Sequence, residues 1–321
     1  MKLLPGGGPL GAYLGGLIFI IKYNGAFHRP SIPRPIPESI ASSKVCAVKF
    51  VDDGTVAVSV KLKTSLVPDP SGRPRPLNYH ERTEHVLPAE NNLLQYLVHD
   101  TEHFARANKM IINKEKTKII SFTKSRKLDF PPELEFLDGT KIETMSETRL
   151  LGVIISNNLK WHKNTSHICN KARQRLWILR RLNKFNLSKQ ELYDVYTKEI
   201  RSILELAVPV WHSSLTKKET KSIESIQKLA FKMILQKDYI TYQQACKHFS
   251  ALSLAERRDK LCLKFAKNNL KSENNLFTKL TNNVNTRNTH NIVKEPFCNT
   301  TRYKKSSIPY LARILNQMGN K

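Results

Sequence analysis

The pattern of hydrophobic and polar positions changes near Ser156. Before that point, short apolar runs bounded by turn residues predict β-strands at 45–51, 55–60, 119–122 and 149–155. After it, apolar positions recur every three or four residues, which is the spacing of one helix face. The chain is therefore predicted to combine an α/β unit over residues 1–155 with an all-helical unit over 156–267.

Several helices can be placed from local signals. Ser188 with Glu191 and Thr216 with Glu219 each form a capping box, in which the hydroxyl and the glutamate satisfy backbone N–H groups of the first turn. An apolar stripe predicts another helix within 91–108, and a basic helix is predicted at about 251–270.

Other segments have weaker patterns. Residues 4–28 are interpreted as a glycine-rich loop followed by a buried helix, and residues 63–88 as an extended connector. The asparagine-rich stretch 268–291 is interpreted as a linker. Residues 292–321 are predicted to form a small C-terminal segment, of which the last twenty residues are expected to dock on the rest of the chain.

The charge of the chain indicates its class of partner. Lys and Arg total 53 against 27 Asp and Glu, a formal charge of +26 over 321 residues. So large a surplus favours a polyanionic partner, nucleic acid first and an anionic membrane second. The five cysteines are odd in number and widely spaced without a CxxC motif. That spacing favours reduced thiols in the cytosol or nucleus over a disulfide framework or a zinc site.

An apolar run at residues 10–21 has the composition of a signal peptide or a membrane segment. Lys22 ends the run too early for a membrane helix, and no small-residue cleavage site follows it. The chain is therefore expected to be neither secreted nor membrane-bound.

The segment Phe50-Val51-Asp52-Asp53 lies between two predicted strands, and Asp53-Gly54 is a tight-turn dipeptide. Two adjacent carboxylates at the tip of such a hairpin suit divalent cations, because Mg²⁺ prefers oxygen ligands. A pair of metal ions there would stabilise the attacking and leaving oxygens of a phosphoryl transfer. The alternative is a solvated turn, in which Asp and Gly are common.

Further motifs surround this hairpin in a definite order. The glycine-rich loop Gly7-Gly8-Pro9-Leu10-Gly11 precedes it, and Asn108-Lys109-Met110 with Asn113-Lys114-Glu115-Lys116-Thr117 follows it. Leu150-Leu151-Gly152-Val153 and Leu159-Lys160-Trp161 come next. Together these motifs resemble the reverse transcriptase of non-LTR retrotransposons, of the jockey or CR1 kind. The resemblance covers most of the chain.

The resemblance implies a fold and an activity. The fold would be an incomplete α+β palm-type polymerase subdomain over residues 1–155, followed by an all-helical thumb and a helical C-terminal region. The implied activity is that of an RNA-directed DNA polymerase, a nucleotidyltransferase. It would extend a DNA primer on an RNA template with deoxynucleoside triphosphates and Mg²⁺, without an obligate protein partner.

The resemblance also assigns roles to individual residues. Asp52 and Asp53 would be the metal ligands, and Lys116 would protonate the leaving pyrophosphate or neutralise its charge. The loop beside the template base and the incoming nucleotide would comprise Gly7, Gly8, Pro9 and Gly11. The hairpin that grips the primer end would comprise Leu151, Gly152 and Val153.

Two departures from the family pattern affect the expected activity. Leu10 stands where the family has Gln, which removes a polar contact near the nascent base pair. The family's third metal-binding carboxylate precedes the glycine-rich loop, where this sequence has only Met1, Lys2 and Leu3. We therefore expect a reverse transcriptase truncated at its N-terminus and inactive as an isolated chain. The alternatives are a non-catalytic nucleic-acid-binding remnant and a basic helical scaffold whose Asp-Asp pair is only a turn.

A basic cluster lies early in the helical unit, beside Trp177: Lys171, Arg173, Arg175, Arg180 and Arg181. Such a cluster could follow a phosphate backbone, with the aromatic ring packing or stacking beside it. A solvated helix face is the alternative interpretation. His162 and His167 lie nearby without a carboxylate partner in sequence, and they are interpreted as structural.

Three later segments recur in the same order in the helical region of this family. They are Pro209-Val210-Trp211, Gln227 with Ala230, and Leu252-Ser253-Leu254 with Arg257-Arg258. Their chemistry alone suggests no function.

Overall fold

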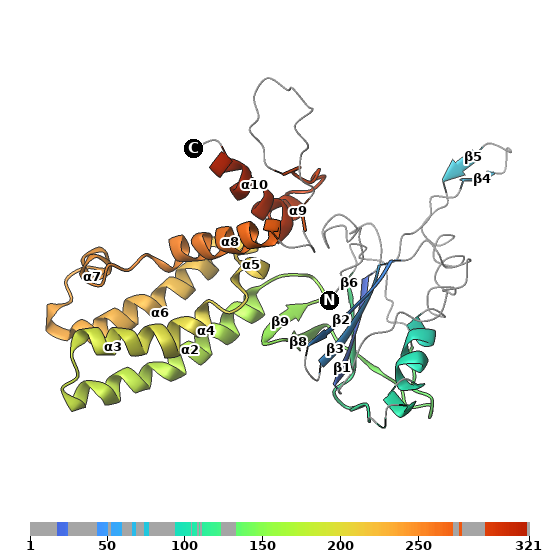
Figure 1. Cartoon of the computed structure of the whole chain (residues 1–321), viewed down its shortest axis with the longest axis horizontal. Coiled ribbons are helices and arrows are strands. Elements are labelled where there is room, and N and C mark those ends of the chain that lie inside the picture. Colours follow the sequence, from blue (N-terminus) through green and yellow to red (C-terminus); the bar gives the residue numbers. More distant parts are fainter. Residues whose placement is uncertain are drawn as a thin grey trace, which may run out of the picture.

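The computed structural model describes a small sheet region and an elongated helical arm (Figure 1). Side chains are described for residues 94–103, 105–107, 109, 111–122, 133–271, 276–277 and 293–317. The backbone alone is described for 318–319 and for five strands, at 18–24, 44–50, 53–59, 66–68 and 74–76.

The main sheet has the strand order β2-β3-β1-β6-β7. Its strands are β1 (Ile18–Asn24), β2 (Lys44–Phe50), β3 (Asp53–Ser59), β6 (Lys118–Phe122) and β7 (Glu143–Thr144). All its neighbours are antiparallel except β6 and β7, which are parallel. A separate two-stranded ribbon pairs β4 (Leu66–Pro68) with β5 (Pro74–Pro76) within the predicted connector.

The strand β1 corrects the prediction of a buried helix within residues 4–28. Ile18-Phe19-Ile20-Ile21 is a run of β-branched and aromatic residues, which favours a strand. A short apolar run does not by itself distinguish a buried strand from a buried helix. Pairing decides the outcome, because β1 is hydrogen-bonded to β3 on one side and to β6 on the other.

The predicted hairpin over 45–60 is present, but its connection lies two residues earlier than the expected Asp53-Gly54 turn. Phe50 pairs with Asp53, so the connection between β2 and β3 spans Val51 and Asp52. Asp53 and Gly54 belong to β3. The register of two seven-residue strands outweighs the local turn preference of the Asp-Gly dipeptide.

A second hairpin connects the sheet region to the arm. It comprises β8 (Glu147–Leu150) and β9 (Val153–Ser156), where the sequence predicted one strand over 149–155. Leu151 and Gly152 form the connection, and both have a positive φ, of 48° and 86°. Two positive φ values are what a type I′ turn requires. The hydrophobic pattern does not reveal this break, because Leu151 continues the apolar run.

The arm consists of helices that run back and forth, as the pattern after Ser156 predicts (Figure 1). The first helix, α2 (His162–Leu182), leads away from the sheet into the 3₁₀ turn η2 (Asn183–Phe185). A continuous helical stretch returns through α3 (Lys189–Val195), the π-helical segment η3 (Tyr196–Arg201) and α4 (Ser202–Leu204).

The chain then reverses twice more. The helix α5 (Val208–Trp211) and the turn η4 (His212–Ser214) lead into α6 (Lys217–Leu235), which runs alongside α2. Asn183 Nδ2 donates a 2.7 Å hydrogen bond to Met233 O, so the C-terminal ends of α2 and α6 lie together. The turn η5 (Gln236–Asp238) and α7 (Tyr242–His248) form the far tip, and α8 (Leu254–Lys271) leads back.

Both predicted capping boxes are confirmed. Ser188 Oγ accepts from the backbone N–H of Glu191, whose carboxylate accepts from the backbone N–H of Ser188. Thr216 and Glu219 make the same reciprocal pair at the start of α6. These bonds satisfy N–H groups that have no partner within the helix.

One hydrophobic core runs through the arm from Val153 to Leu315. Its centre is aromatic: the Tyr193 and Phe249 rings stack with centroids 4.6 Å apart, and Tyr196 meets Phe231 edge-on at 5.6 Å. Close aromatic pairs of this kind add to the stabilisation from burial. Ile155 of β9 contacts both this core and the pair Ile120 and Phe122 of β6, so the second hairpin joins the two regions.

The predicted docking of the C-terminal segment is also present. The short helix α9 (Thr301–Lys304) precedes α10 (Ser307–Gly319), which packs on α8 and α5. Leu311, Ala312 and Leu315 enter the arm core. The predicted linker 268–291 lies mostly outside the described residues. None of the described helices is long and apolar enough to cross a membrane.

Candidate nucleic-acid interface

Part of the predicted site lies outside the described residues. Gly7, Gly8, Pro9, Gly11 and Asp52 belong to segments that the structure does not describe, and Asp53 is described by its backbone alone. Of the predicted chemical groups in the sheet region, the structure therefore places the Asp53 backbone, Lys116 and the second hairpin.

The sheet register brings Asp53 and Lys116 to the same end of the sheet. Asp53 pairs with Asn24 at the end of β1, and Lys22 pairs with Lys118 at the start of β6. Lys116 lies two residues ahead of Lys118. It therefore lies on the far side of β1 from Asp53, two strand spacings or about 10 Å away.

Lys116 lies in a tightly bonded turn. Asn113 Oδ1 accepts from the backbone N–H of Lys116 at 3.0 Å, and Asn113 O accepts from Thr117 Oγ1 at 2.9 Å. Lys114 in the same turn is ion-paired with Asp138, and this hydrogen bond holds the pKa of Asp138 well below its usual range. Lys116 itself is exposed and has no ion-pair partner among the described residues. Its ammonium group is thus available to an added anion.

The predicted primer-grip residues form the tip of the second hairpin. Leu151 is about half exposed and has a left-handed backbone conformation, which is uncommon for a non-glycine residue. At Gly152 an added Cβ would lie 3.0 Å from Leu206 Cδ2, so glycine allows the end of α4 to approach the turn. Ile154 N donates a 3.1 Å hydrogen bond to the buried Asn164 of α2, which fixes the hairpin on the arm.

The structure divides the predicted basic cluster of α2 into two parts. Arg175 lies on one flank and is hydrogen-bonded to Glu199 of η3, and Lys171 precedes it by one turn on that flank. Arg173, Arg180 and Arg181 lie on the opposite, exposed side with Trp177 and Lys184. Partial neutralisation by Glu199 makes Arg175 a weaker candidate for a phosphate contact.

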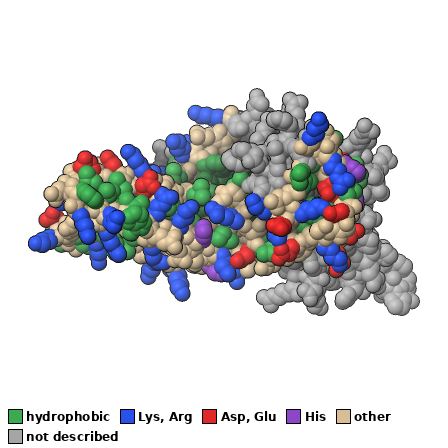
Figure 2. Space-filling model, turned by 90° about the horizontal axis from the view of Figure 1, so that it is seen from below, with side chains coloured by type: hydrophobic (Ala, Val, Ile, Leu, Met, Phe, Trp, Pro, Cys, Tyr) green, Lys and Arg blue, Asp and Glu red, His purple; other side chains and the backbone are tan. Residues whose placement is uncertain are grey.

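The exposed side of α2 is hereafter the α2 face, defined by Arg173, Trp177, Arg180, Arg181 and Lys184. Arg173, Trp177, Arg180 and Lys184 are spaced by three or four positions, which places them along one line that continues from α2 into η2, and Arg181 borders that line. Trp177 is 56% exposed, and the Arg181 guanidinium lies 5.8 Å from the centre of its ring. Figure 2, seen from the α2 side, shows Lys and Arg side chains well in excess of acidic ones along the arm. An exposed indole between arginines is the arrangement that stacks a base beside bound phosphates.

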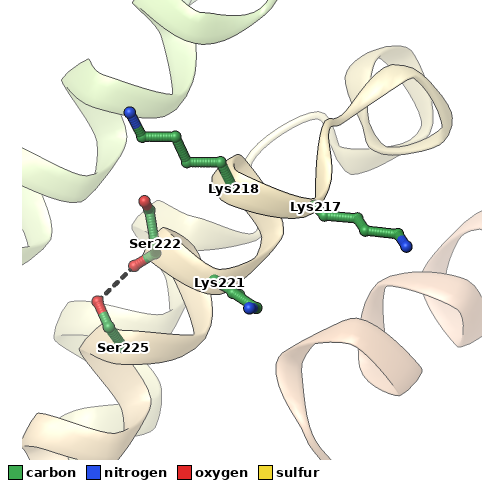
Figure 3. A pocket seen from close by; sticks show the side chains of 5 residues that line it. All are labelled: Lys217, Lys218, Lys221, Ser222 and Ser225. Atoms are coloured by element: carbon green, nitrogen blue, oxygen red, sulfur yellow. Dashed lines mark hydrogen bonds between the residues drawn. The ribbon is translucent and has the colours of Figure 1, made fainter.

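The start of α6 has a shallow hollow of about 450 Å³, lined by Lys217, Lys218, Lys221, Ser222 and Ser225. All five residues come from one helix, and Ser225 Oγ donates a 2.6 Å hydrogen bond to Ser222 O. Figure 3 shows the Lys218 side chain pointing away from those of Lys217 and Lys221. Because the three ammonium groups diverge, the hollow does not form a binding site for a small anion.

Two of the three later segments to which the sequence assigned no function, those of Gln227 and Leu252, meet in a buried polar network with Tyr196 and Tyr242. Tyr196 Oη donates to Gln227 Oε1 at 2.7 Å, and Gln227 Nε2 donates to Tyr242 Oη at 2.8 Å and to Leu252 O at 3.0 Å. Gln227 is 1% exposed, and burial raises the pKa of Tyr196. The network fixes α6 against the segment that leads into α8.

Arg258 is the other buried polar group of these segments, at 1% exposure. Its Nε donates to His212 Nδ1 at 3.1 Å, and burial lowers its pKa. His212 Nε2 lies 2.7 Å from Asp259 Oδ1, which also accepts from Tyr310 of α10 at 2.5 Å. The hydrogen bond from His212 is the main cause that lowers the pKa of Asp259. This cluster holds η4, α8 and α10 together. A signal in the sequence was the position of Arg258 in line with the apolar residues Leu254, Cys262 and Ala266 of the same helix.

His162 and His167 were interpreted as structural from the sequence. His162 and His167 lie in the first two turns of α2, the former exposed and the latter half-buried. Within the described ranges, no three His, Cys, Asp or Glu side chains are grouped so that they could hold a metal ion. Comparison with known proteins adds no family: no family model matches the chain, and no curated protein matches it.

Proposed function

We propose that the chain is part of an RNA-directed DNA polymerase of the non-LTR retrotransposon type, in which the helical arm holds nucleic acid beside a palm-like sheet. One observation carries the proposal. The pairing of β1 with β3 and β6 brings Asp53 and Lys116, which are distant in sequence, to the same end of one sheet.

The chemistry of that end suits phosphoryl transfer. Asp52 and Asp53 would hold Mg²⁺, and the metal would stabilise charge on the reacting phosphate. Lys116 lies across β1, at a separation that a long lysine side chain and a nucleoside triphosphate can span together. An exposed ammonium there would neutralise or protonate the leaving pyrophosphate.

The second hairpin supports the same proposal by its position. It packs on β6 through Ile155 and on α2 through Asn164, so it lies between the sheet and the arm. An exposed Leu151 at its tip would contact the end of a primer whose duplex lies along the α2 face.

The experiment is complementation. The two carboxylates alone supply too few oxygens to fix two metal ions, so the chain alone should not extend a primer. Supplied with a fingers-and-palm segment from a related retrotransposon, it should incorporate a nucleotide on a primed RNA template. Extension by the unsupplemented chain, or none by the complemented one, would contradict the proposal.

The second candidate function is sequence-independent binding of nucleic acid without catalysis. It is favoured by the α2 face, in which arginines and an exposed tryptophan all lie on one helix. This candidate predicts salt-dependent duplex binding by the chain and no incorporation after complementation.

A further inference from the structure

The solvent side of α8 carries a line of four lysines, Lys260, Lys264, Lys267 and Lys271, all of them exposed. They are spaced by four, three and four residues, so they lie along one side of the helix for about 16 Å. The buried residues of α8, Leu254, Arg258, Cys262 and Ala266, define the opposite side. We call this line of lysines the α8 face.

The charge of the α8 face is uncompensated. None of its four lysines has an ion-pair partner in the part of the chain that the structure describes. The acids of α8 are engaged elsewhere: Glu256 bonds to Ser253, and Asp259 bonds to His212 and Tyr310. By contrast, Arg257 on the flank of the same helix is neutralised by Glu205.

The α8 face lies on the other edge of the arm from the α2 face. In Figure 1, α2 follows one edge and α8 the other, with α6 between them. The helix α6 packs against both. With 8–10 Å between packed helix axes and side chains pointing outward on both edges, the two faces lie about 25–30 Å apart. One straight duplex lying along either face would not contact the other.

The composition of the two faces also differs. The α2 face has arginines around an exposed indole, whereas the α8 face has lysines alone. Lysine interacts as a flexible point charge, which suits phosphates and carries no base preference. The apolar side of α8 is occupied by the arm core, and Phe265 is its one exposed large hydrophobic side chain among those described, which is too little apolar surface to insert the helix into a lipid bilayer.

We propose that the α8 face binds the phosphate backbone of a second nucleic-acid segment, so that the arm bridges two segments at once. The bridging claim rests on the proposed binding of a first segment at the α2 face.

The test is a capture assay. An immobilised short DNA duplex is loaded with protein, and capture of a second, labelled duplex is measured at a protein concentration at which sedimentation shows a monomer. The variant is Lys260→Gln, Lys264→Gln and Lys267→Gln together. The control removes the same charge from diverging lysines, Lys217→Gln, Lys218→Gln and Lys221→Gln.

The α8 variant should bind the first duplex as the wild type does and capture the second about tenfold less. For binding of the second duplex, the slope of log K against log salt should become smaller by about three. The control should capture normally. Three results would overturn the proposal. Both variants could lose capture of the second duplex equally, the α8 variant could lose none, or the α8 variant could lose only its binding to phosphatidylserine vesicles. A failure of the proposed binding at the α2 face would be seen separately. Changing Arg173, Arg180 and Arg181 to Gln would then leave binding of the first duplex unchanged.

Discussion

The sheet region and the helical arm differ in how they bring functional residues together. In the sheet, Asp53 and Lys116 are 63 positions apart and meet only through the register of β1 with its two neighbours. In the arm, the residues of the α2 face belong to adjacent turns of one stretch of chain. The chemistry of the sheet thus depends on long-range pairing, whereas the charge pattern of the arm is set by helix periodicity.

On the proposed function, this difference would separate catalysis from binding. Changes at the end of the sheet should affect the chemical step and leave nucleic-acid affinity intact, and changes on the α2 face should do the reverse.

The largest effect among the side chains that the structure describes is expected at Lys116. In the chain complemented with a fingers-and-palm segment, Lys116→Ala should slow single-turnover incorporation by about 10²–10⁴-fold, because the leaving pyrophosphate loses its acid. Duplex affinity should stay unchanged in a fluorescence-anisotropy titration. Lys109→Ala, at an exposed position outside the turn of Lys116, is the matched control. An affinity loss as large as the rate loss would assign Lys116 to binding.

The next effect is expected on the α2 face. Changing Arg173, Arg180 and Arg181 to Gln should weaken duplex binding by on the order of tenfold at moderate salt and lower the salt slope by about three. Arg175→Gln should have a smaller effect per charge, since Glu199 already neutralises that guanidinium. An unaltered slope in the triple variant would show that the α2 face is only solvated.

A third prediction concerns the buried network that shapes the arm. Gln227→Ala leaves the Tyr196 hydroxyl and the Leu252 carbonyl without their partner, so it should lower the free energy of unfolding by about 2–3 kcal/mol. The exposed Gln243→Ala in α7 should cost little. Denaturant titration measures both. Equal stabilities would mean that water replaces the Gln227 bonds.

The smallest effect is expected at a helix cap. Thr216→Ala removes the acceptor for the Glu219 N–H and should destabilise the arm by about 1 kcal/mol, while Thr216→Ser should be nearly neutral. Thermal unfolding followed by circular dichroism compares the two. A full-sized loss in Thr216→Ser would point to packing of the threonine methyl group instead of capping.

The sequence predicts features that depend only on residues close to one another along the chain. The caps at Ser188 and Thr216 follow from spacing alone, and the structure has them where they were predicted. The predicted basic cluster of α2 is divided between two flanks of the helix. The prediction of a helix where the structure has β1 was wrong. The run Ile18-Phe19-Ile20-Ile21 suits a buried strand or a buried helix, and pairing with neighbouring strands decides between the two.

Other features could not be predicted because they arise from contacts between distant segments. The shift of the first hairpin connection to Val51 and Asp52 follows from strand register. The neutralisation of Arg175 requires Glu199 from another helix, and the Gln227 network joins three separate segments. Single-sequence patterns contain no information about such pairings.

Single-turnover incorporation by the complemented chain, compared between the wild type and Asp52→Asn, decides whether the Asp-Asp hairpin is the catalytic metal site. Both proteins should bind primed RNA template with the same affinity through the arm. The wild type should incorporate one nucleotide with Mg²⁺, and Asp52→Asn should incorporate none, because a shared metal ligand is lost. Full incorporation by Asp52→Asn would contradict the assignment of the hairpin as the catalytic metal site.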